Sequence, residues 1–589
     1  MGLDAWITLI VIAGVLVSLI TSRFNPAIVV LAGVLALLVL NVIDAEQALA
    51  GFANPAPITV AALYVLAGGI QKTGALTPLM QSTFGNRGTI RLPLTRTLVP
   101  TAASSAFLNN TPIVAMLMPQ AMTWASRRGV AASKLLMPIS FAAVLGGTMT
   151  IIGTSTNLVV AGQMGSLGLE PMGFFEIGAI GLPLTVVGLA LVIWLAPLVL
   201  PDRRTARDDL EESAKRFSVE MQVVADGPID GKTVNEARLR HLQGVFLASV
   251  DRGDTVIAPV TPDTVLRGGN RLHFVGRTSD VVDLQEMPGL RSAELKHVLD
   301  MSAPSVGYFE AVVGNGSPLL GRTLAETGFR SAYQAAVVAI HRDGELIDAK
   351  LGQVTLRVGD CLLLVSDSGF KERWGDKADF LLVAQVDGQP PRATKRAWIP
   401  VVTLVAVVAL AAFNVLPILQ GSLLGALVLV LTGVLTPLEA RRAIDIDVVV
   451  IIAAAFGLAA AMETSGLAEV VSNGLVGAFD WLGPTGVLLG IVIATIVTTE
   501  LITNNAAALL MLPIAVAAAA EVGLDPRGVA IAVAVAASAS FLTPIGYQTN
   551  TMVLGPGGYR FSDYSRLGAP LTVLTIAVIV VLVPVIWPG

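Results

Sequence analysis

Charged side chains are scarce in this sequence of 589 residues. It contains 38 Lys and Arg and 43 Asp and Glu, which make up 14% of the chain, whereas soluble domains have about 25%. The mean hydropathy is +0.74. These values exclude intrinsic disorder and a single soluble enzyme. The net charge of −5 does not indicate the basic surface that nucleic-acid binding requires.

Cysteine and histidine are also nearly missing. Cys361 is the single cysteine, so no intrachain disulfide is possible, and no Cys or His cluster has metal-ligand spacing. We therefore expect no redox or zinc chemistry and no covalent cofactor. The four histidines lie in one region, which excludes an imidazole relay elsewhere in the chain. They are His241, His273, His297 and His341.

The few charges are unevenly distributed. Residues 201–396 hold 53 charges in 196 positions, whereas the other 393 residues hold 28. A chain with one region of ordinary charge between two regions of very low charge is typical of a polytopic α-helical membrane protein interrupted by one soluble insert.

Long apolar runs predict five membrane spans in each half of the chain. The run 5–21 lacks the basic start of a signal peptide and is soon followed by a second run, so we interpret it as a retained span. Each half also contains a broken apolar stretch, at about 98–125 and about 484–516. The predicted spans are 5–21, 27–43, 57–76, 133–162 and 174–200, then 397–413, 420–436, 447–463, 528–553 and 567–587.

Basic residues predict the orientation, because cytoplasmic loops are enriched in Lys and Arg. Loops 44–56 and 163–173 contain none, which requires the first broken stretch to enter and leave from the cytoplasm as a re-entrant hairpin. The basic residues in or near the other loops are Arg23, Arg87, Arg91, Arg96, Arg127, Arg128 and Lys134, then Arg441, Arg442, Arg560 and Arg566.

The same alternation places the insert in the cytoplasm and both termini outside. The acidic stretch with Glu463, Glu469 and Asp480 falls outside, so the second hairpin enters from the opposite face. The halves 1–200 and 397–589 are therefore predicted to be inverted-topology repeats, an architecture of transporters.

The two halves share a pair of motifs. Residues 147–162 (GTMTIIGTSTNLVVAG) and 540–555 (SFLTPIGYQTNTMVLG) match at seven of 16 positions. Upstream, LNNTP in the first half matches TNNAA in the second, which pairs Asn109 and Asn110 with Asn504 and Asn505. Such internal similarity at matched spacing indicates that both halves repeat one unit.

These motifs suit sites for ions. Asn-Asn pairs form helices poorly, and at a hairpin tip their amides and nearby backbone N–H groups can bind an anion. In the G-x-x-T-N segments, glycine permits an unwound backbone whose carbonyls, with Thr and Asn oxygens, can coordinate Na⁺. The alternative is polar packing between helices through Ser, Thr and Asn.

Glu500 lies four residues before Asn504 and has two interpretations. It can carry a coupling proton, or it can hydrogen-bond the hairpin backbone as a structural residue. No Lys or Arg lies within the four motifs, so a bound anion would be held by dipoles, amides, hydroxyls and co-bound cations.

The hairpin motifs and the T-x-x-G-x-x-T-N motifs resemble the divalent anion/sodium symporter family of the ion transporter superfamily, over essentially all 393 membrane residues. Members carry Ser-Asn-Thr at both tips, bind dicarboxylate, tricarboxylate or sulfate there, and work as homodimers by an elevator movement. This sequence departs from the pattern with Asn109 and Asn504 for the serines and Ala506 for the second threonine.

The resemblance and the motif chemistry together predict two sets of site residues. The substrate set is Asn109, Asn110, Thr111, Thr156, Asn504, Asn505 and Thr549, and the Na⁺ set is Thr150, Gly153, Ser155, Asn157, Thr543, Gly546 and Asn550.

The insert has its own repeat, with an offset of 90 residues. Residues 223–240 parallel 312–330, and 265–276 parallel 355–366, each unit being a strand, G-[KR]-T, a short helix and further strands. Domains 201–300 and 301–396 thus resemble tandem TrkA C-terminal (RCK C-terminal) domains, which sense ligands or dimerise. GPIDGKT is one residue short of a P-loop, so no nucleotide is implied.

The sequence therefore predicts a multi-pass importer of the plasma membrane, not an enzyme. It would couple Na⁺ to a small divalent anion, with sulfate favoured by the extra amide donors, and would be regulated by the insert and its small ligand. The alternatives are a proton-coupled or cation-exchanging relative and, ranked lower for want of a TVGYG-like filter, a potassium channel subunit.

Overall fold

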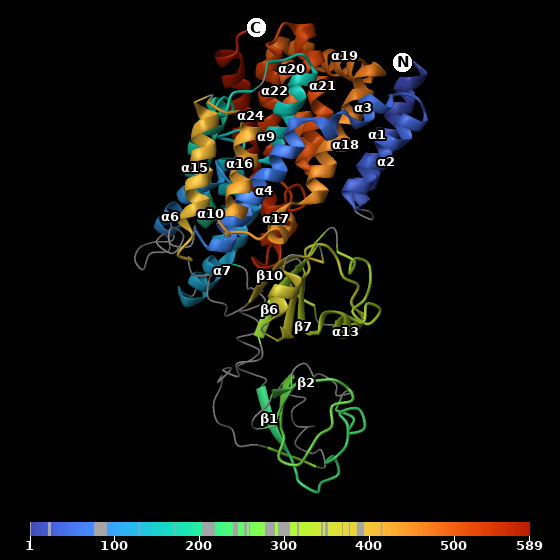
Figure 1. Cartoon of the computed structure of the whole chain (residues 1–589), viewed down its shortest axis with the longest axis vertical. Coiled ribbons are helices and arrows are strands. Elements are labelled where there is room, and N and C mark those ends of the chain that lie inside the picture. Colours follow the sequence, from blue (N-terminus) through green and yellow to red (C-terminus); the bar gives the residue numbers. More distant parts are fainter. Residues whose placement is uncertain are drawn as a thin grey trace. The chain divides into compact units, whose positions relative to one another are not determined.

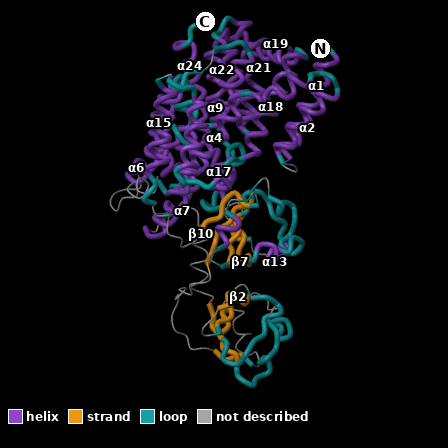
Figure 2. The backbone as a smooth tube through the Cα atoms, viewed as in Figure 1, coloured by secondary structure: helices purple, strands orange, loops and turns teal. Residues whose placement is uncertain are grey.

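The chain folds into two compact units (Figure 1). The first comprises Met1–Asp202, Pro390–Leu554 and Arg560–Gly589, and the second comprises Arg203–Gln389 and Gly555–Tyr559. Helices make up the first unit and the strands lie in the second (Figure 2). The structure, a computed structural model, describes all residues except 1, 22–24, 76–90, 129, 171, 203–217, 240–244, 253–255, 258–259, 277–288, 293–306, 315–316, 343–344, 348–350, 368, 376, 378, 386–393 and 414.

The helical unit repeats one order of elements. The first half contains α1 (Leu3–Thr21), α2 (Pro26–Val39), α3 (Ala45–Ala53), α4 (Pro55–Thr73), α6 (Arg91–Ser105), α7 (Asn110–Arg128), α8 (Leu136–Gly147), α9 (Ser155–Ser166) and α10 (Gly178–Val199). The second contains α15 (Trp398–Ala412), α16 (Ile418–Leu431), α17 (Pro437–Ala443), α18 (Ile446–Thr464), α19 (Leu467–Phe479), α20 (Gly483–Leu501), α21 (Asn504–Val522), α22 (Pro526–Ser538), α23 (Gln548–Leu554) and α24 (Phe561–Ile586). Residues 76–90, which precede α6, lie outside the described residues, as do Arg23, His241 and His297.

Several of these segments are long and apolar enough to cross a membrane. The described part of the chain contains six such segments and also some shorter apolar helices. The six long segments are Ala45–Thr73, Gly178–Val199, Ile446–Thr464, Gly483–Leu501, Asn504–Val522 and Phe561–Ile586. The fold is therefore that of a mostly helical, polytopic membrane protein, as the composition predicts.

The two broken apolar stretches are helix pairs joined by short turns. α6 ends at Ser105 and α7 begins at Asn110, while α20 ends at Leu501 and α21 begins at Asn504. Asparagine competes for backbone hydrogen bonds and favours helix starts over helix interiors. The Asn-Asn pairs consequently lie at the turns.

Two predicted spans are interrupted in corresponding places. Span 133–162 is divided into α8 and α9 by the non-helical residues 148–154, and span 528–553 into α22 and α23 by residues 539–547. Both interruptions contain the glycine of the G-x-x-T-N motif.

Two short helices were not predicted. α3 lies in the supposed loop 44–56 and begins with a capping box between Asp44 and Gln47. Its counterpart α17 begins with a capping box between Thr436 and Glu439. Capping boxes of this kind are readable from sequence, but these helices are too short to show a clear apolar period.

The open ends of the two helix pairs lie at opposite ends of α10. Lys134 follows α7, and its ammonium donates to Leu200 O and, at 3.0 Å, to Pro197 O at the end of α10. Arg527 follows α21 and donates at 2.7 Å to Glu176, just before α10 begins. With 22 residues, α10 spans about 33 Å, roughly the hydrocarbon thickness of a bilayer.

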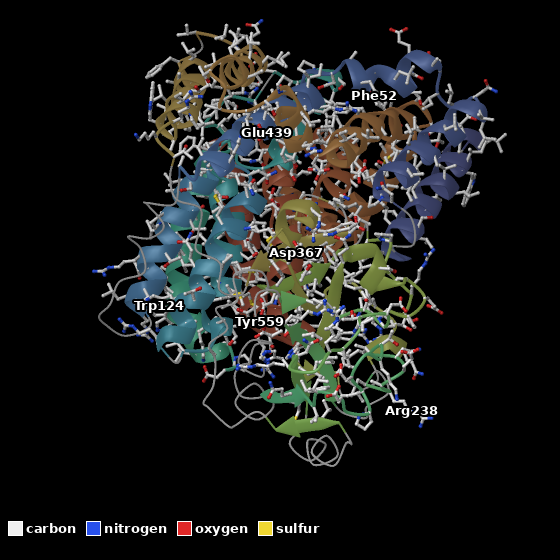
Figure 3. All side chains as sticks on the ribbon, turned by 60° about the horizontal axis from the view of Figure 1, so that its bottom comes forward. Phe52, Trp124, Arg238, Asp367, Glu439 and Tyr559 are labelled. Carbon is white, nitrogen blue, oxygen red and sulfur yellow. The ribbon has the colours of Figure 1, made fainter. Side chains whose placement is uncertain are left out.

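Another ion pair joins the halves. The ammonium of Lys72, in the last turn of α4, lies 2.7 Å from Glu439 Oε2 on α17. Glu439 is labelled in Figure 3. The halves also pack through α18 against α2 and α3, α16 against α4, and α24 against α10. The helical unit is thus one body formed by both halves.

The second unit contains two five-stranded antiparallel sheets with one strand order. The first, β3-β2-β4-β1-β5, corresponds to the second, β8-β7-β9-β6-β10. Their strands are β1 (Ser218–Val223), β2 (Val245–Asp251), β3 (Val256–Ile257), β4 (Arg271–Gly276) and β5 (Leu290–Ser292), then β6 (Gly307–Val313), β7 (Ala335–Arg342), β8 (Glu345–Leu346), β9 (Cys361–Ser366) and β10 (Phe380–Gln385).

Corresponding side chains make corresponding contacts 90 residues apart. Arg252 Nη2 donates to Val265 O at 2.8 Å, and Arg342 Nη2 donates to Thr355 O at 2.7 Å. The short helix expected in each repeat is present as α13 (Phe329–Tyr333) in the second. The corresponding residues of the first repeat, about 239–243, fall almost entirely outside the described residues.

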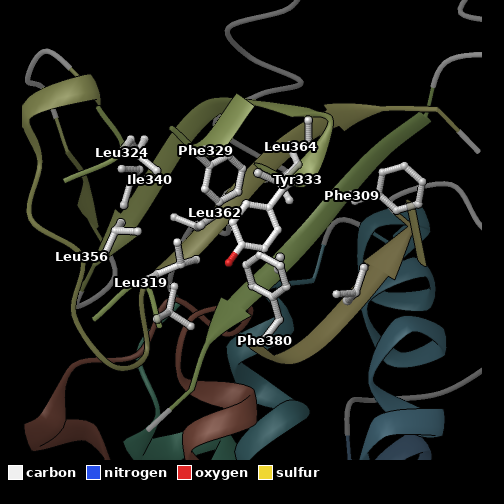
Figure 4. Packing of buried hydrophobic residues seen from close by; sticks show 14 of the residues in the cluster. Phe309, Leu319, Leu324, Phe329, Tyr333, Ile340, Leu356, Leu362, Leu364 and Phe380 are labelled. Atoms are coloured by element: carbon white, nitrogen blue, oxygen red, sulfur yellow. The ribbon is translucent and has the colours of Figure 1, made fainter. Parts of the chain in front are cut away.

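Each sheet has its own apolar core. In the second sheet Phe329, Tyr333 and Phe380 pack closely beside Leu362 and Leu364 (Figure 4). The rings of Phe329 and Tyr333 stack with centroids 4.6 Å apart. Aromatic stacking adds to the stabilisation from buried area.

Candidate functional site

The structure corrects the pairing of the two hairpin tips. α7 and α21 are both 19 residues long, begin at Asn110 and Asn504, and carry a proline at their tenth position. Asn110 therefore corresponds to Asn504, not to Asn505. The alignment of the two Asn-Asn pairs was wrong by one residue, because it matched identical residues and not the positions at which the two helices begin.

Hydrogen bonds show the same register. The hydroxyl of Ser105 donates to Asn110 Oδ1, and that of Thr499 donates to Asn504 Oδ1 at 3.0 Å, in each case five residues along the chain. Asn109 thus corresponds to Thr503, so Thr503 stands at the first position of the second tip. With the corrected pairing, Asn504 and Ala506 no longer stand at the serine and threonine positions of the Ser-Asn-Thr pattern, so they are not departures from it.

The first tip contacts the broken helix of the second half. Asn110 Nδ2 donates to the Tyr547 hydroxyl at 2.6 Å, and the Thr111 hydroxyl donates to Gln548 Oε1 at 3.3 Å. Asn109 instead remains in its own half, where its Nδ2 donates to the hydroxyl of Tyr64 on α4 at 3.3 Å.

The second tip contacts the broken helix of the first half. Asn505 Oδ1 accepts hydrogen bonds from Ser155 Oγ at 3.1 Å and from Thr156 Oγ1 at 3.0 Å. The pairs Asn505 with Ser155 and Thr111 with Gln548 occupy corresponding positions. Each tip therefore completes the other half of the unit.

The two motif asparagines hold the unwound segments closed. Asn157 Nδ2 donates to the carbonyls of Gly147 at 2.9 Å and Thr150 at 2.8 Å. Asn550 Nδ2 donates to the carbonyls of Ser540 at 2.8 Å and Thr543 at 3.4 Å. Both are fully buried. A single amide thereby satisfies two carbonyls that the helix break leaves free.

Both motif glycines are required by close approach. A Cβ on Gly153 would lie 2.3 Å from Gly147 O, and one on Gly546 would lie 2.1 Å from Ser540 Oγ. Neither distance is possible for a real side chain, so the loops need glycine for space.

The remaining predicted residues are buried at the same place. The hydroxyl of Thr150 donates to Ala106 O, which links the unwound segment to the end of α6. Thr549 Oγ1 and Asn550 Oδ1 both lie within 2.8 Å of Ser140 Oγ on α8. The backbone N–H of Thr543 donates to Glu500 Oε2 at 3.0 Å, and the Thr543 hydroxyl accepts from the N–H of Gly546 at 3.3 Å.

Glu500 lies in the last turn of α20, beside the second unwound segment. Its carboxylate accepts backbone N–H groups of Leu542 at 2.8 Å and Thr543 at 3.0 Å. The side chain is 9% exposed. The side chains of Thr543 and Ser540 also contact this carboxyl group, and all of these contacts fit the structural interpretation.

The site gathers the N-terminal ends of helices from both halves. α9 packs against α21, and α23 packs against α7. Helix N-termini carry partial positive charge and free N–H groups, so together they favour a negative ligand. A cavity of about 30 Å³ opens beside the first tip, lined by Tyr64, Asn109 and Ser155 among apolar side chains.

Six residues that contact the predicted site residues escaped the motif search: Tyr64, Ser105, Ser140, Thr499, Tyr547 and Gln548. Tyr547 and Gln548 fall inside the matched segment, but there the other half has Thr154 and Ser155, so identity did not single them out. Tyr64 and Ser140 lie on helices without a motif. The correspondence of Thr503 to Asn109 could be recognised only with the corrected register.

Comparison with known proteins identifies a family and several similar proteins. Residues 16–535 match the model of a family described as citrate transporter. A Chlamydomonas reinhardtii protein whose name links it to sulfur deprivation is 35% identical, over 91% of this chain and 94% of its own length. An uncharacterized transporter of Synechocystis is also 35% identical, over 91% and 90%.

More distant relatives have names that state a substrate. Sodium/sulfate cotransporter 1 of Chlamydomonas reinhardtii is 26% identical over 90% of this chain and 84% of its own length. These relatives are transporters, not enzymes. With a family match over most of its length and a fold of membrane-spanning helices, the chain belongs to the citrate transporter family.

Proposed function

We propose that this protein is a Na⁺-coupled symporter of a small divalent anion and that sulfate is its substrate. The observation that carries the proposal is the reciprocal contact of the two tips, Asn110 with Tyr547 and Asn505 with Thr156. Both contacts join helix N-terminal ends from different halves. They create a polar site inside an otherwise apolar helical unit.

The chemistry of the site supports an anion. It offers amides, hydroxyls and helix N-terminal N–H groups, and no Lys or Arg lies in the four motifs. Neutral donors in a low-dielectric site bind a divalent anion well only if cations balance its charge. The names of the sodium/sulfate relatives favour sulfate over citrate.

The unwound segments support the bound Na⁺. Each is a turn of backbone rich in carbonyls and Thr or Asn oxygens, closed by one asparagine amide. Asn157 Oδ1 is buried and, within the described chain, has no hydrogen-bond partner. A buried oxygen of this kind is a suitable ligand for a small cation.

Inverted topology is supported by the two contacts at the ends of α10. Because Lys134 and Arg527 follow equivalent helices but bind opposite ends of α10, the hairpins enter from opposite faces. Such repeats suit alternating access by an elevator movement in a homodimer. The N- and C-termini lie at one end of the helical unit in Figure 1, and we place both outside.

The second unit is proposed to be a cytoplasmic regulator. Its two sheets share a strand order and 90-residue correspondences, as expected of tandem TrkA C-terminal domains. We propose that a small ligand of these domains alters transport.

The test is uptake of radiolabelled sulfate into proteoliposomes with an imposed Na⁺, K⁺ or proton gradient. We expect a Na⁺ gradient to drive uptake and unlabelled sulfate to compete better than citrate or succinate. Asn110→Ala and Asn505→Ala should abolish uptake, whereas Gln120→Ala, farther along α7, should preserve it. Uptake that responds only to the proton gradient would replace Na⁺ coupling with the proton-coupled alternative.

A further inference from the structure

The helix that follows the unwound segment is shorter in the second half. α9 and α23 begin at corresponding residues, Ser155 and Gln548, but α9 has 12 residues and α23 has 7. The residues that would complete α23 are Gly555–Tyr559. Their sequence, GPGGY, contains a proline and three glycines, which are the poorest helix formers. The second half therefore has a Pro-Gly segment in place of the last part of this helix.

This segment belongs to the second unit. Gly555–Tyr559 groups with Arg203–Gln389, although α23 before it and α24 after it belong to the helical unit. All of its residues are buried, and the side chain of Tyr559 is fully buried. Between α23 and α24 the chain thus leaves the helical unit, enters the second unit and returns.

Gly555 lies against the start of β9. A Cβ on Gly555 would lie 2.7 Å from Cys361 Cβ and 3.2 Å from Gly359 O. The first distance is too short for a real side chain, so this approach requires glycine. The corresponding glycine of α9, Gly162, has its Cβ position 2.7 Å from Ala56 Cβ, within the helical unit. Corresponding glycines therefore pack in different units.

The second sheet is buried on the face that Gly555 contacts as well as on its core face. Leu362 and Leu364 belong to the apolar core, so the alternation of a strand places Cys361 and Leu363 on the other face of β9. Val312 of β6 lies opposite Cys361 in register. All three are 0% exposed. We call Val312, Cys361 and Leu363 the outer patch.

The first sheet is polar at the corresponding positions. Gln222, Arg271 and His273 stand there, 90 residues earlier; the first two are exposed and the third is partly exposed. Because the two sheets share a strand order, this fold does not need an apolar outer face. An apolar patch suits a surface that stays covered. The contact with Gly555 identifies the Pro-Gly segment as part of that cover.

The proposed inverted topology explains why only one half has such a segment. Arg560 and Arg566 follow it, so the rule for basic residues predicts that it lies in the cytoplasm, as the insert does. Loop 163–173, at the corresponding end of α9, contains no basic residue and is predicted to lie outside. The insert can therefore reach the end of α23 but not the end of α9.

α23 connects the segment to the predicted transport site. At the start of this helix Gln548 accepts a hydrogen bond from Thr111, and Tyr547 just before it accepts one from Asn110. A helix of 7 residues is about 10 Å long, and its stability depends on packing more than on helix propensity. The position of its C-terminal end therefore affects both contacts at its start.

We propose that the Gly555–Tyr559 segment, packed on the outer patch of the second sheet, is an anchor through which the second unit positions α23 and its contacts with the first tip. The anchor stays engaged during transport, because its release would expose an apolar patch and buried backbone to water. Gly555 and Cys361 are positioning residues. This inference rests on the proposed transport function and names the route by which the second unit would regulate it.

The first test uses Cys361, the single cysteine of the chain, as a reporter of the cover. The full-length protein in detergent is treated with a maleimide, and modification is followed by mass spectrometry against the denatured protein. Burial raises the pKa of the Cys361 thiol, which keeps it in the unreactive form while it is covered. We expect slow modification of the wild type and at least about tenfold faster modification of Gly555→Leu, because the larger side chain favours local opening.

Two controls accompany this measurement. Cys361→Ala combined with Arg271→Cys moves the reporter to the corresponding exposed position of the first sheet and should react fast with either residue at position 555. Gly474→Leu, on α19 with nothing within 4 Å of its Cβ position, should leave Cys361 as slow as in the wild type. Equal rates in the wild type and Gly555→Leu overturn the inference.

The second test is sulfate uptake. Gly555→Ala should lower kcat/KM about tenfold, mainly through KM, because a displacement of about 1 Å can cost up to about 100-fold. Cys361→Gly removes the atom nearest to the new methyl group, so adding it to Gly555→Ala should recover most of the loss. Unchanged uptake in Gly555→Ala overturns the anchor, and faster uptake would identify a brake and also overturn it. If Cys361→Gly alone does not fold, Gly555→Ala and the labelling carry the test.

The labelling separates failure of this inference from failure of the proposed function, because it needs no substrate. Normal sulfate uptake by the wild type, with equal labelling of the wild type and Gly555→Leu, overturns the inference alone. Faster labelling of Gly555→Leu with unchanged uptake in Gly555→Ala overturns the link to transport. A wild type that takes up no sulfate overturns the proposed function, whatever the labelling shows.

Discussion

The side-chain nitrogen of Asn110 lies 2.6 Å from the hydroxyl of Tyr547, although 437 residues separate them along the chain. Asn110 is fully buried, and the hydroxyl of Ser105 occupies its side-chain oxygen. The tip of the first hairpin is therefore fixed on both sides of one amide, and one of its two anchors comes from the other half.

Tyr547→Phe should impair transport more than it impairs folding. The change leaves a buried N–H of Asn110 without its acceptor, at a cost of about 1–3 kcal/mol. We expect kcat/KM for sulfate uptake to fall about tenfold. The paired control is Tyr64→Phe, which removes the longer 3.3 Å contact to Asn109 and should have a smaller effect. A greater loss in Tyr64→Phe would contradict the central place given to Asn110.

Gly153→Ala should destabilise the helical unit. Its Cβ would lie 2.3 Å from Gly147 O, so the unwound segment must move, at a cost of about 1–3 kcal/mol. Gly165→Ala on α9, the helix that follows the unwound segment, is the control, because nothing lies within 4 Å of its Cβ position and alanine favours helix. Thermal unfolding in detergent measures both. Equal unfolding temperatures would show that the segment is not tightly packed.

The Lys72–Glu439 pair should make a small pH-dependent contribution to stability. The hydrogen bond from Lys72, with those from Thr436, lowers the pKa of Glu439 from its ordinary 4.5 to about 2. Since the folded pKa is the lower one, the contribution is complete above pH 4.5 and disappears as the pH falls towards 2. The side chains are 44% and 39% exposed, so it amounts to less than about 1 kcal/mol.

The measurement compares unfolding of the wild type and Glu439→Gln between pH 3 and pH 7. Their difference in unfolding temperature should be constant above about pH 5 and shrink below it. A difference that grows on acidification would refute this account of the pair.

Asp360→Ala should weaken the second sheet alone. Asp360 is fully buried and binds the Arg342 guanidinium through both oxygens, at 2.8 and 2.7 Å. Removing one partner of such a pair typically costs about 3–5 kcal/mol. Asp360→Asn, which copies Asn270 at the corresponding position of the first sheet, should cost less. Amide exchange in the full chain should rise in β7 and β9 and remain unchanged in β2 and β4; equal exchange in both sheets would contradict the prediction.

Much of this organisation can be predicted from the sequence, because the apolar runs of a membrane protein make both its helices and its few polar residues easy to recognise. Apolar runs place the helices, and Asn110, Asn157, Asn504 and Asn550 stand out because amides are rare in apolar surroundings. These residues all lie at the tips or unwound segments. The order of elements in the two halves follows from the same signals.

The rest depends on three-dimensional contacts. Identical letters aligned Asn110 with Asn505, whereas the helix start and the Ser105 and Thr499 contacts align it with Asn504. Tyr64 and Ser140 contribute from helices that carry no motif, so only packing reveals them. Glu500 could be noticed in the sequence, but its convergence with Ser540 could not.

The contacts between the halves also determine when, during synthesis, the first hairpin can form its contact with Tyr547. A ribosome adds about 5–20 residues per second, so the 437 residues between Asn110 and Tyr547 take roughly 20–90 s. Until then the amide of the first hairpin has no permanent acceptor in the apolar membrane. The first hairpin therefore lacks this contact until the second half has been synthesised.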